Sequence, residues 1–131
     1  MRLLIDTSAY SAFMRGNSNV LGLIQRAEQI FVNAVVLGEL NAGFRLGKRF
    51  KRNRELLDRF LSSPRVSSLP LDDDTALRYA DIVEHLRGVG SPIPSNDLWI
   101  AATAMQHGLI LVSTDRHFLR VPQVSKEILE I

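Results

Sequence analysis

The sequence predicts an α/β fold: a three-layer α/β/α sandwich with a mostly parallel central sheet. Short apolar runs of strand length alternate with longer stretches whose apolar residues recur at helical spacing. One of these stretches, residues 97–107, is apolar on nearly every face, as expected of a buried helix. The chain has 131 residues, the size of one domain, and we expect residues 1–131 to form a single domain.

The strands are predicted from apolar runs that are too short to be ordinary helices. The first run, residues 2–5, ends in the polar triplet Asp-Thr-Ser, which favours a turn at the end of a strand. Residues 121–124 contain Pro122, which is compatible only with an edge strand. The strands expected in chain order are residues 2–5, 30–32, 66–69, 109–112 and 121–124.

The segments between these runs show helical periodicity. Val20, Leu23 and Ala27 follow the i, i+3, i+7 spacing of an apolar stripe, and a later stripe recurs every four residues from position 36 to 44. Three consecutive aspartates at 72–74 suit the start of a helix, where carboxylates cap free amides. The expected helices are residues 9–15, 19–29, a helix ending near 47, a basic helix closing at 62–64, a helix following 72–74, and residues 97–107.

Composition excludes several classes of protein. The chain has no cysteine, so disulfide scaffolds, thiolate zinc sites and cysteine nucleophiles are excluded. It has no apolar run of about 18 residues for a membrane span, and its start is charged by the sixth residue, unlike a signal peptide. We therefore expect a cytoplasmic protein without a membrane partner.

Basic residues are concentrated in one part of the chain. The net charge is only +2, but seven Lys and Arg side chains fall within residues 45–59, which contain two acids. Such a stretch is either an ordinary solvated helix face or a surface that attracts a polyanion. The residues expected to attract a polyanion such as a nucleic acid are Lys48, Arg49, Lys51 and Arg52.

Four acids are expected to meet at one edge of the sheet. Asp6 ends the first strand and Asp115 follows strand 109–112, so in a parallel sheet both lie at the same rim. Helices return antiparallel to the strands and begin at that rim, which adds Asp97 from a first helical turn and Glu39 from an early one. Each acid alone could be a helix or turn cap, but four from separate segments predict a shared site.

The expected ligand of this site is Mg²⁺ or Mn²⁺. Four like charges repel one another unless a cation compensates them, and carboxylate oxygens with water suit these two ions. The hydroxyls of Thr7, Ser113 and Thr114 are placed to orient a carboxylate or to contact a phosphate. A metal bound in this way can activate water for hydrolysis of a phosphodiester. None of the three histidines, at positions 85, 107 and 117, is expected to be a ligand, although His117 follows Asp115 closely enough to contact a phosphate.

The residues also carry a family resemblance. Four segments that together span the chain resemble, in order and spacing, the motifs of PIN-domain ribonucleases of the VapC type, toxins of toxin–antitoxin pairs: LLIDTSAY, VVLGELNAG, NDLWIAATAMQHG and LVSTDRHFLRV. The resemblance assigns the family's acidic site to Asp6, Glu39, Asp97 and Asp115. Asn33-Ala34 stands where the family often has a Ser or Thr cap, and Gln123 where it often has Gly.

The resemblance implies a Mg²⁺- or Mn²⁺-dependent endoribonuclease, a homodimer, and inhibition by a small cognate antitoxin that wraps the toxin. Two other hypotheses remain open from the residues alone. A phosphotransfer signalling domain also gathers aspartates and Mg²⁺ at the ends of parallel strands, but this chain lacks an acidic pair beside the first strand. A catalytically silent module with the same fold is the second alternative, and the complete set of acids argues against it.

Overall fold

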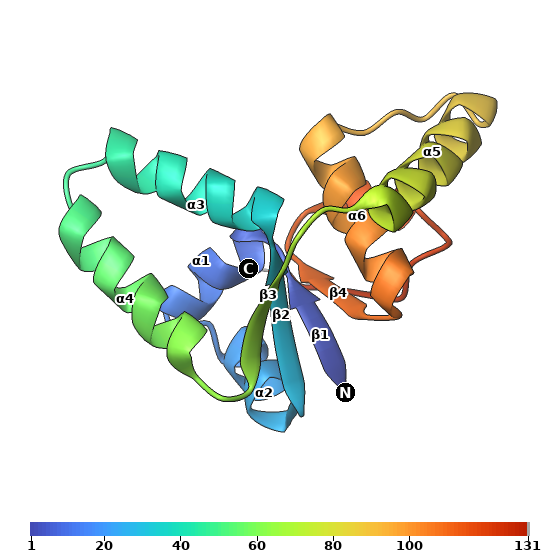
Figure 1. Cartoon of the computed structure of the whole chain (residues 1–131). Helices are drawn as coiled ribbons and strands as arrows, with labels where there is room; N and C mark the ends of the chain where they lie inside the picture. The colour runs from blue at the N-terminus through green and yellow to red at the C-terminus, as the bar shows by residue number, and fades with distance from the viewer. Residues whose placement is uncertain (131) are drawn as a thin grey trace.

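The computed structural model describes residues 1–130 and shows a five-stranded sheet in the order β3-β2-β1-β4-β5 (Figure 1). All four neighbouring strand pairs are parallel, which confirms the α/β class. The strands are β1 (Arg2–Ile5), β2 (Gln29–Asn33), β3 (Val66–Leu69), β4 (Ile110–Ser113) and β5 (Lys126–Ile128). The helices are α1 (Thr7–Met14), α2 (Ser18–Arg26), α3 (Ala34–Leu46), α4 (Phe50–Ser62), α5 (Asp73–Gly88), α6 (Ser95–His107) and the short 3₁₀ helix η1 (Arg116–Arg120).

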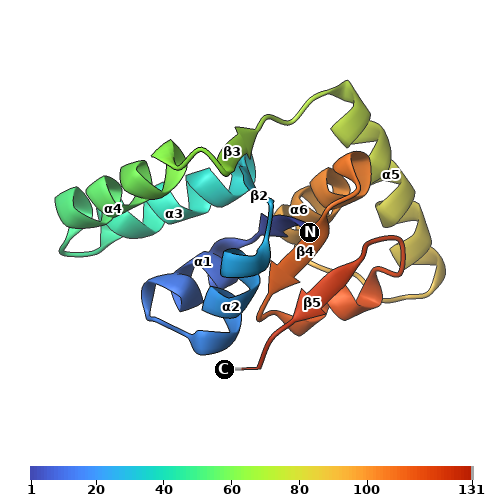
Figure 2. The same ribbon diagram turned by 90° about the horizontal axis from the view of Figure 1, so that it is seen from below.

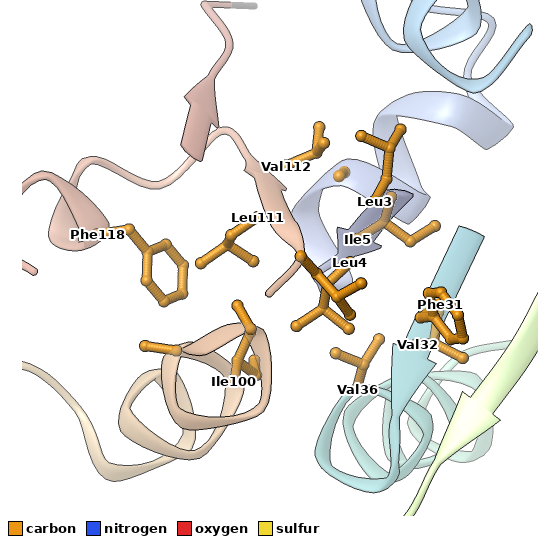
Figure 3. Packing of buried hydrophobic residues seen from close by; sticks show 14 of the residues in the cluster. Leu3, Leu4, Ile5, Phe31, Val32, Val36, Ile100, Leu111, Val112 and Phe118 are labelled. Atoms are coloured by element: carbon orange, nitrogen blue, oxygen red, sulfur yellow. The ribbon is translucent and has the colours of Figure 1, made fainter. Parts of the chain in front are cut away.

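Helices cover both faces of the sheet. Along β1, Leu3 and Leu4 point to opposite faces, as the alternation of a strand requires (Figure 3). Leu4 points toward Val36 of α3 and Ile100 of α6, whereas Leu3 points toward the face on which α1 lies (Figure 3). All four side chains are at most 1% exposed. The core therefore lies in two apolar layers, one on each side of the sheet.

The last strand differs from the sequence prediction. Residues 121–124 were expected to form it, but β5 begins at Lys126 and pairs with β4, with Val112 opposite Glu127. Val121 and Val124 are buried, 0% and 4% exposed, yet they lie in a turn in which the amide of Val124 donates to the carbonyl of Val121. Their apolar character therefore reflects burial and not strand pairing. Pro122, which lies between them, has no backbone N–H to donate to a neighbouring strand.

The strand order fixes where a functional site can form. From β1 the chain builds outward to β2 and β3, and then returns through α5 and α6 to add β4 on the other side of β1. The carboxyl ends of β1 and β4 are therefore neighbours, with Ile5 opposite Val112. In sheets of this kind the crevice at such a reversal point is where ligands bind.

Helices α3 and α4 form an antiparallel pair that projects from the sheet as an arm (Figures 1 and 2). Val36 and Leu40 are buried in α3, and Leu57 in α4. The ring of Phe60 attaches α4 to α1 through edge contact with Tyr10, at 5.3 Å between ring centroids. Among residues 1–130, no helix is both long enough and apolar enough to cross a membrane.

Candidate active site

The four acids predicted from the sequence lie at the carboxyl end of the sheet. Asp6 follows β1, Asp115 follows β4, Asp97 lies in the first turn of α6, and Glu39 lies in the second turn of α3. Burial is the main cause of the raised pKa of Asp6 and of Asp97, and neighbouring charges add to it: that of Asp97 acts on Asp6, and those of Asp115 and Glu39 act on Asp97. The topology thus brings together the residues that the sequence separates by up to 109 positions.

Asp6 is the most deeply buried of the four, at 5% exposure. It is the N-cap of α1, and its Oδ1 accepts hydrogen bonds from the amide of Ala9 at 2.8 Å and the hydroxyl of Ser8 at 2.7 Å. Ser113 donates to its Oδ2 at 2.5 Å. Burial raises the pKa of Asp6, and these donors act against that rise. The residue is therefore both a helix cap and a carboxyl group whose ionised form is disfavoured by burial.

Glu39 is held by donors from two other helices. Thr7 of α1 donates to its Oε1 at 2.7 Å, and Asn96 of α6 donates to its Oε2 at 3.3 Å. Helix α3 is itself fixed against α6 by Asn33, whose side chain accepts from the amide of Val36 and donates to Thr103 at 2.9 Å. Asn33 thus supplies the cap that the family often takes from Ser or Thr.

Asp97 and Asp115 meet at the ring of His117. Nδ1 of His117 is 3.0 Å from Oδ2 of Asp97 and 3.1 Å from Oδ1 of Asp115, and ligand atoms of the three residues lie within 4.8 Å of one another. Burial is the main cause of the raised pKa of Asp97; the hydrogen bond with His117 opposes it. These three side chains form the tightest potential metal-binding group among residues 1–130.

The hydroxyl-bearing residues fall into two groups. The hydroxyls of Thr7 and Ser113 donate directly to the carboxylates of Glu39 and Asp6. The Ser113 hydroxyl also accepts from the amide of Asp115 at 2.8 Å and so joins Asp115 to Asp6. Thr114 contributes its backbone, whose amide donates to Ser8 at 3.0 Å. A network of short hydrogen bonds therefore ties the end of β4 to the start of α1.

Three site residues were missed by sequence reasoning: Ser8, Asn96 and His117. Ser8 and Asn96 neighbour predicted acids, and serine two residues after an aspartate is a recurrent local donor. His117 was expected to lie outside the ligand set, and the site was expected to lack histidine. The 3₁₀ turn of η1, capped by Asp115 through the amide of His117 at 2.9 Å, brings its ring back over the acids.

The predicted RNA-steering residues lie apart from the acids, at the junction of α3 and α4. Lys48, Arg49, Lys51 and Arg52 are all exposed, and none of them pairs with an acid within residues 1–130. Arg54, in the same helix, is instead paired with Asp58 at 3.0 Å and bonded to Asn41. Four positive charges therefore remain available at the arm.

Comparison with known proteins identifies the family. The model of the PIN domain matches residues 3–124. The chain belongs to the PIN-domain family. Ribonuclease VapC of Rickettsia bellii is 31% identical over 126 residues, covering 95% of this chain and 93% of that protein. Ribonuclease VapC4 of Mycobacterium tuberculosis is 31% identical over 93 residues, covering 71% of this chain and 72% of that protein.

Solved structures agree with this assignment. The crystal structure of VapBC2 from Rickettsia felis, bound to a DNA fragment from the promoter, contains a chain with a TM-score of 0.85 and 27% identity. The match covers 99% of the present chain and 100% of that one. The parallel sheet with helices on both faces is thus the architecture of the VapC-type PIN domain, and the acidic end of the sheet lies within the matched region.

Proposed function

We propose that this PIN domain is a metal-dependent endoribonuclease that acts as the toxin of a type II toxin–antitoxin system. The convergence of Asp6, Glu39, Asp97 and Asp115 at one rim is the observation that carries the proposal. The two relatives described above, from Rickettsia bellii and Mycobacterium tuberculosis, are named ribonucleases, which supports RNA as the substrate. Residues 1–131 act as one nuclease unit in this proposal.

The chemistry of the site fits a divalent cation. The pKa of Asp6 and that of Asp97 are raised by burial and by neighbouring carboxylates. The protein's own positive charges therefore do not balance the negative charges of the ionised cluster. Asp6, Asp97 and Asp115 would hold Mg²⁺ or Mn²⁺, with Glu39 acting directly or through water. When bound, such a cation lowers the pKa of a water and stabilises charge that develops on a phosphoryl oxygen.

The surrounding donors keep the carboxylates in place for this task. Ser113 holds Asp6 and the amide of Asp115, while Thr7 holds Glu39. Thr114 lies at the mouth of the same network through its amide bond to Ser8, and its hydroxyl is proposed to contact the phosphate. Because each acid is oriented before substrate arrives, little reorganisation is needed in the reaction.

Substrate attraction is assigned to the basic arm. Lys48, Arg49, Lys51 and Arg52 are exposed and unpaired with acids in the described part of the chain, which suits contact with the phosphates of single-stranded RNA. Helix α3, which forms the arm together with α4, also carries Glu39. A strand of RNA held by the arm is therefore directed along α3 toward the acids.

The partner is proposed to be a small cognate antitoxin that wraps this chain and covers the acidic site. Its support is the likeness to a chain of VapBC2 from Rickettsia felis and to one of VapBC-5 from Mycobacterium tuberculosis, which is a member of the VapBC family of toxin–antitoxin systems. A homodimer and a cytoplasmic location, where RNA and a newly made antitoxin are both present, complete the proposal. Co-purification with the product of the adjacent reading frame, and loss of cleavage on adding that product, test it.

Replacement of one site acid tests the enzymatic part. Asp6→Asn and Asp97→Asn should each abolish metal-dependent cleavage of a labelled RNA while leaving the circular dichroism spectrum intact. Asp81→Asn, which changes an exposed acid on α5, is the matched control and should cleave like the parent. Metal-dependent cleavage retained by both site variants would refute the assignment.

A further inference from the structure

The imidazole of His117 occupies an unusual position in the site. Its Nδ1 contacts carboxylates from two different segments, Asp97 of α6 at 3.0 Å and Asp115 after β4 at 3.1 Å. A neutral ring carries at most one proton on Nδ1 and can therefore donate a good hydrogen bond to only one of the two oxygens. Where Nδ1 carries no proton, its lone pair faces the same space as the two carboxylate oxygens, which is how the ligands of a cation are arranged.

The two contacts of His117 fit a metal's coordination shell. Neighbouring ligands in an octahedral site with bonds of about 2.1 Å lie about 3.0 Å apart. The distances from Nδ1 to Asp97 and to Asp115, 3.0 and 3.1 Å, are of this size. The three residues form the group of potential ligand atoms within 4.8 Å of one another. Little movement of the side chains is needed for all three to bind one ion.

The other two acids are occupied differently. Both oxygens of Asp6 accept hydrogen bonds from protein donors, and so do both oxygens of Glu39. Asp97 and Asp115 each have one oxygen, Oδ1 and Oδ2 respectively, that accepts no hydrogen bond within residues 1–130. The side of the site nearest His117 is thus the side with free ligand capacity.

We propose that Nδ1 of His117 is a direct ligand of the divalent cation and adds one nitrogen to the carboxylates of Asp6, Asp97 and Asp115 assigned to it above. The inference rests on the proposed metal-dependent function and refines it. An imidazole nitrogen is a poor ligand for Mg²⁺ and a good one for first-row transition metals. The cation site therefore prefers Mn²⁺ over Mg²⁺ by more than an all-carboxylate site would.

The decisive test is the nitrogen coupling of bound Mn²⁺. Electron spin echo envelope modulation on the Mn²⁺-loaded protein should show the coupling of a directly bound ¹⁴N, and labelling histidine with ¹⁵N should change it. The coupling should disappear in His117→Gln and persist in His107→Gln. His107 is a matched control because it lies at the opposite end of α6 from Asp97, roughly 15 Å away along the helix.

Calorimetry without RNA gives a second readout. His117→Gln should weaken Mn²⁺ binding by about tenfold or more, with a smaller loss for Mg²⁺. Mn²⁺ that binds the parent without any histidine coupling would overturn the ligand assignment and leave the metal nuclease intact. Absence of Mn²⁺ binding by the parent would overturn both the ligand assignment and the proposed function.

Discussion

The acidic rim and the basic arm are built in opposite ways. At the rim, Asp6 is 5% exposed and Ser113 is fully buried, and their hydrogen bond joins residues 107 positions apart. On the arm, formed by α3 and α4, Leu46 is 91% exposed, and Leu57 is the buried residue of α4. The rim is held by hydrogen bonds between distant segments, whereas the arm projects from the sheet (Figure 2) and buries only Val36, Leu40 and Leu57.

This difference separates chemistry from recognition. Catalytic groups need positions fixed to within a fraction of an ångström, which requires a rigid, hydrogen-bonded setting. Attraction of a flexible polyanion needs only positive charge in the right place, and exposed side chains supply that charge. We therefore expect changes at the rim to remove turnover and changes on the arm to weaken binding.

Removal of the metal should have the largest effect. A chelator should lower RNA cleavage by on the order of 10²–10³-fold or more, because it removes the cation that would activate water and stabilise charge on the phosphoryl oxygen. Adding Mn²⁺ back should restore cleavage and stabilise the folded protein, by about 2.7 kcal/mol at a hundred times the dissociation constant. RNA binding through the arm should survive chelation. Loss of binding and cleavage together would break the proposed division.

Neutralising the arm should have an intermediate effect. Replacement of Lys48, Arg49, Lys51 and Arg52 with Gln should weaken RNA binding roughly tenfold or more at low salt. The slope of log affinity against log salt should become shallower by up to about 0.7 per lost phosphate contact. The cleavage rate at saturating protein should change little. Fluorescence anisotropy across a salt series measures this, and an unchanged slope would remove RNA steering from these residues.

The smallest expected effect is on the stability of the metal-free protein, which Asp6→Asn should raise. The pKa of Asp6 is raised by burial, so the folded protein binds that proton more tightly than the unfolded chain. Stability is therefore greatest below the unfolded pKa and is lost as pH rises through the folded pKa. Asn keeps the cap of α1 and removes the charge, so we expect a gain of about 0.5–2 kcal/mol at pH 7.

Urea denaturation with chelator measures this gain between pH 3 and 7. The difference between Asp6→Asn and the parent should shrink toward acid pH, where the Asp6 carboxyl is protonated in both states. Asp81→Asn, the exposed control, should change stability by less than about 0.5 kcal/mol throughout. A variant less stable than the parent at pH 7 would show that the site acid contributes to stability rather than opposing it.

The rim could be predicted from the sequence because its positions follow from topology. In a parallel sheet the carboxyl ends of the strands and the first turns of the helices that follow them lie at the same edge. Asp6, Asp97 and Asp115 can therefore be placed once the strands and helices are identified. Their burial and their individual donors could not be predicted in this way. Those details depend on side-chain packing between segments, such as the bond from Asn96 to Glu39.

The errors lie where local geometry overrides pattern. Residues 121–124 were predicted as a strand because apolar character marks burial, but burial there occurs in a turn, and β5 forms two residues later from a mostly polar segment. The contacts of His117 with Asp97 and Asp115 were not foreseen, because sequence spacing does not show how η1 folds its ring over Asp97. A 3₁₀ turn of five residues leaves too weak a periodic signal to be recognised.

The central claim is that hydrolysis takes place at the acidic rim, and single-turnover cleavage with saturating protein tests it most directly. Asp115→Asn and the variant with a neutralised arm should be compared with the parent on one labelled RNA in Mn²⁺. We predict that Asp115→Asn binds the RNA within a few-fold of the parent and cleaves it at least about 10²-fold more slowly. Cleavage by Asp115→Asn at the parent's rate, with the same dependence on Mn²⁺, would contradict the account.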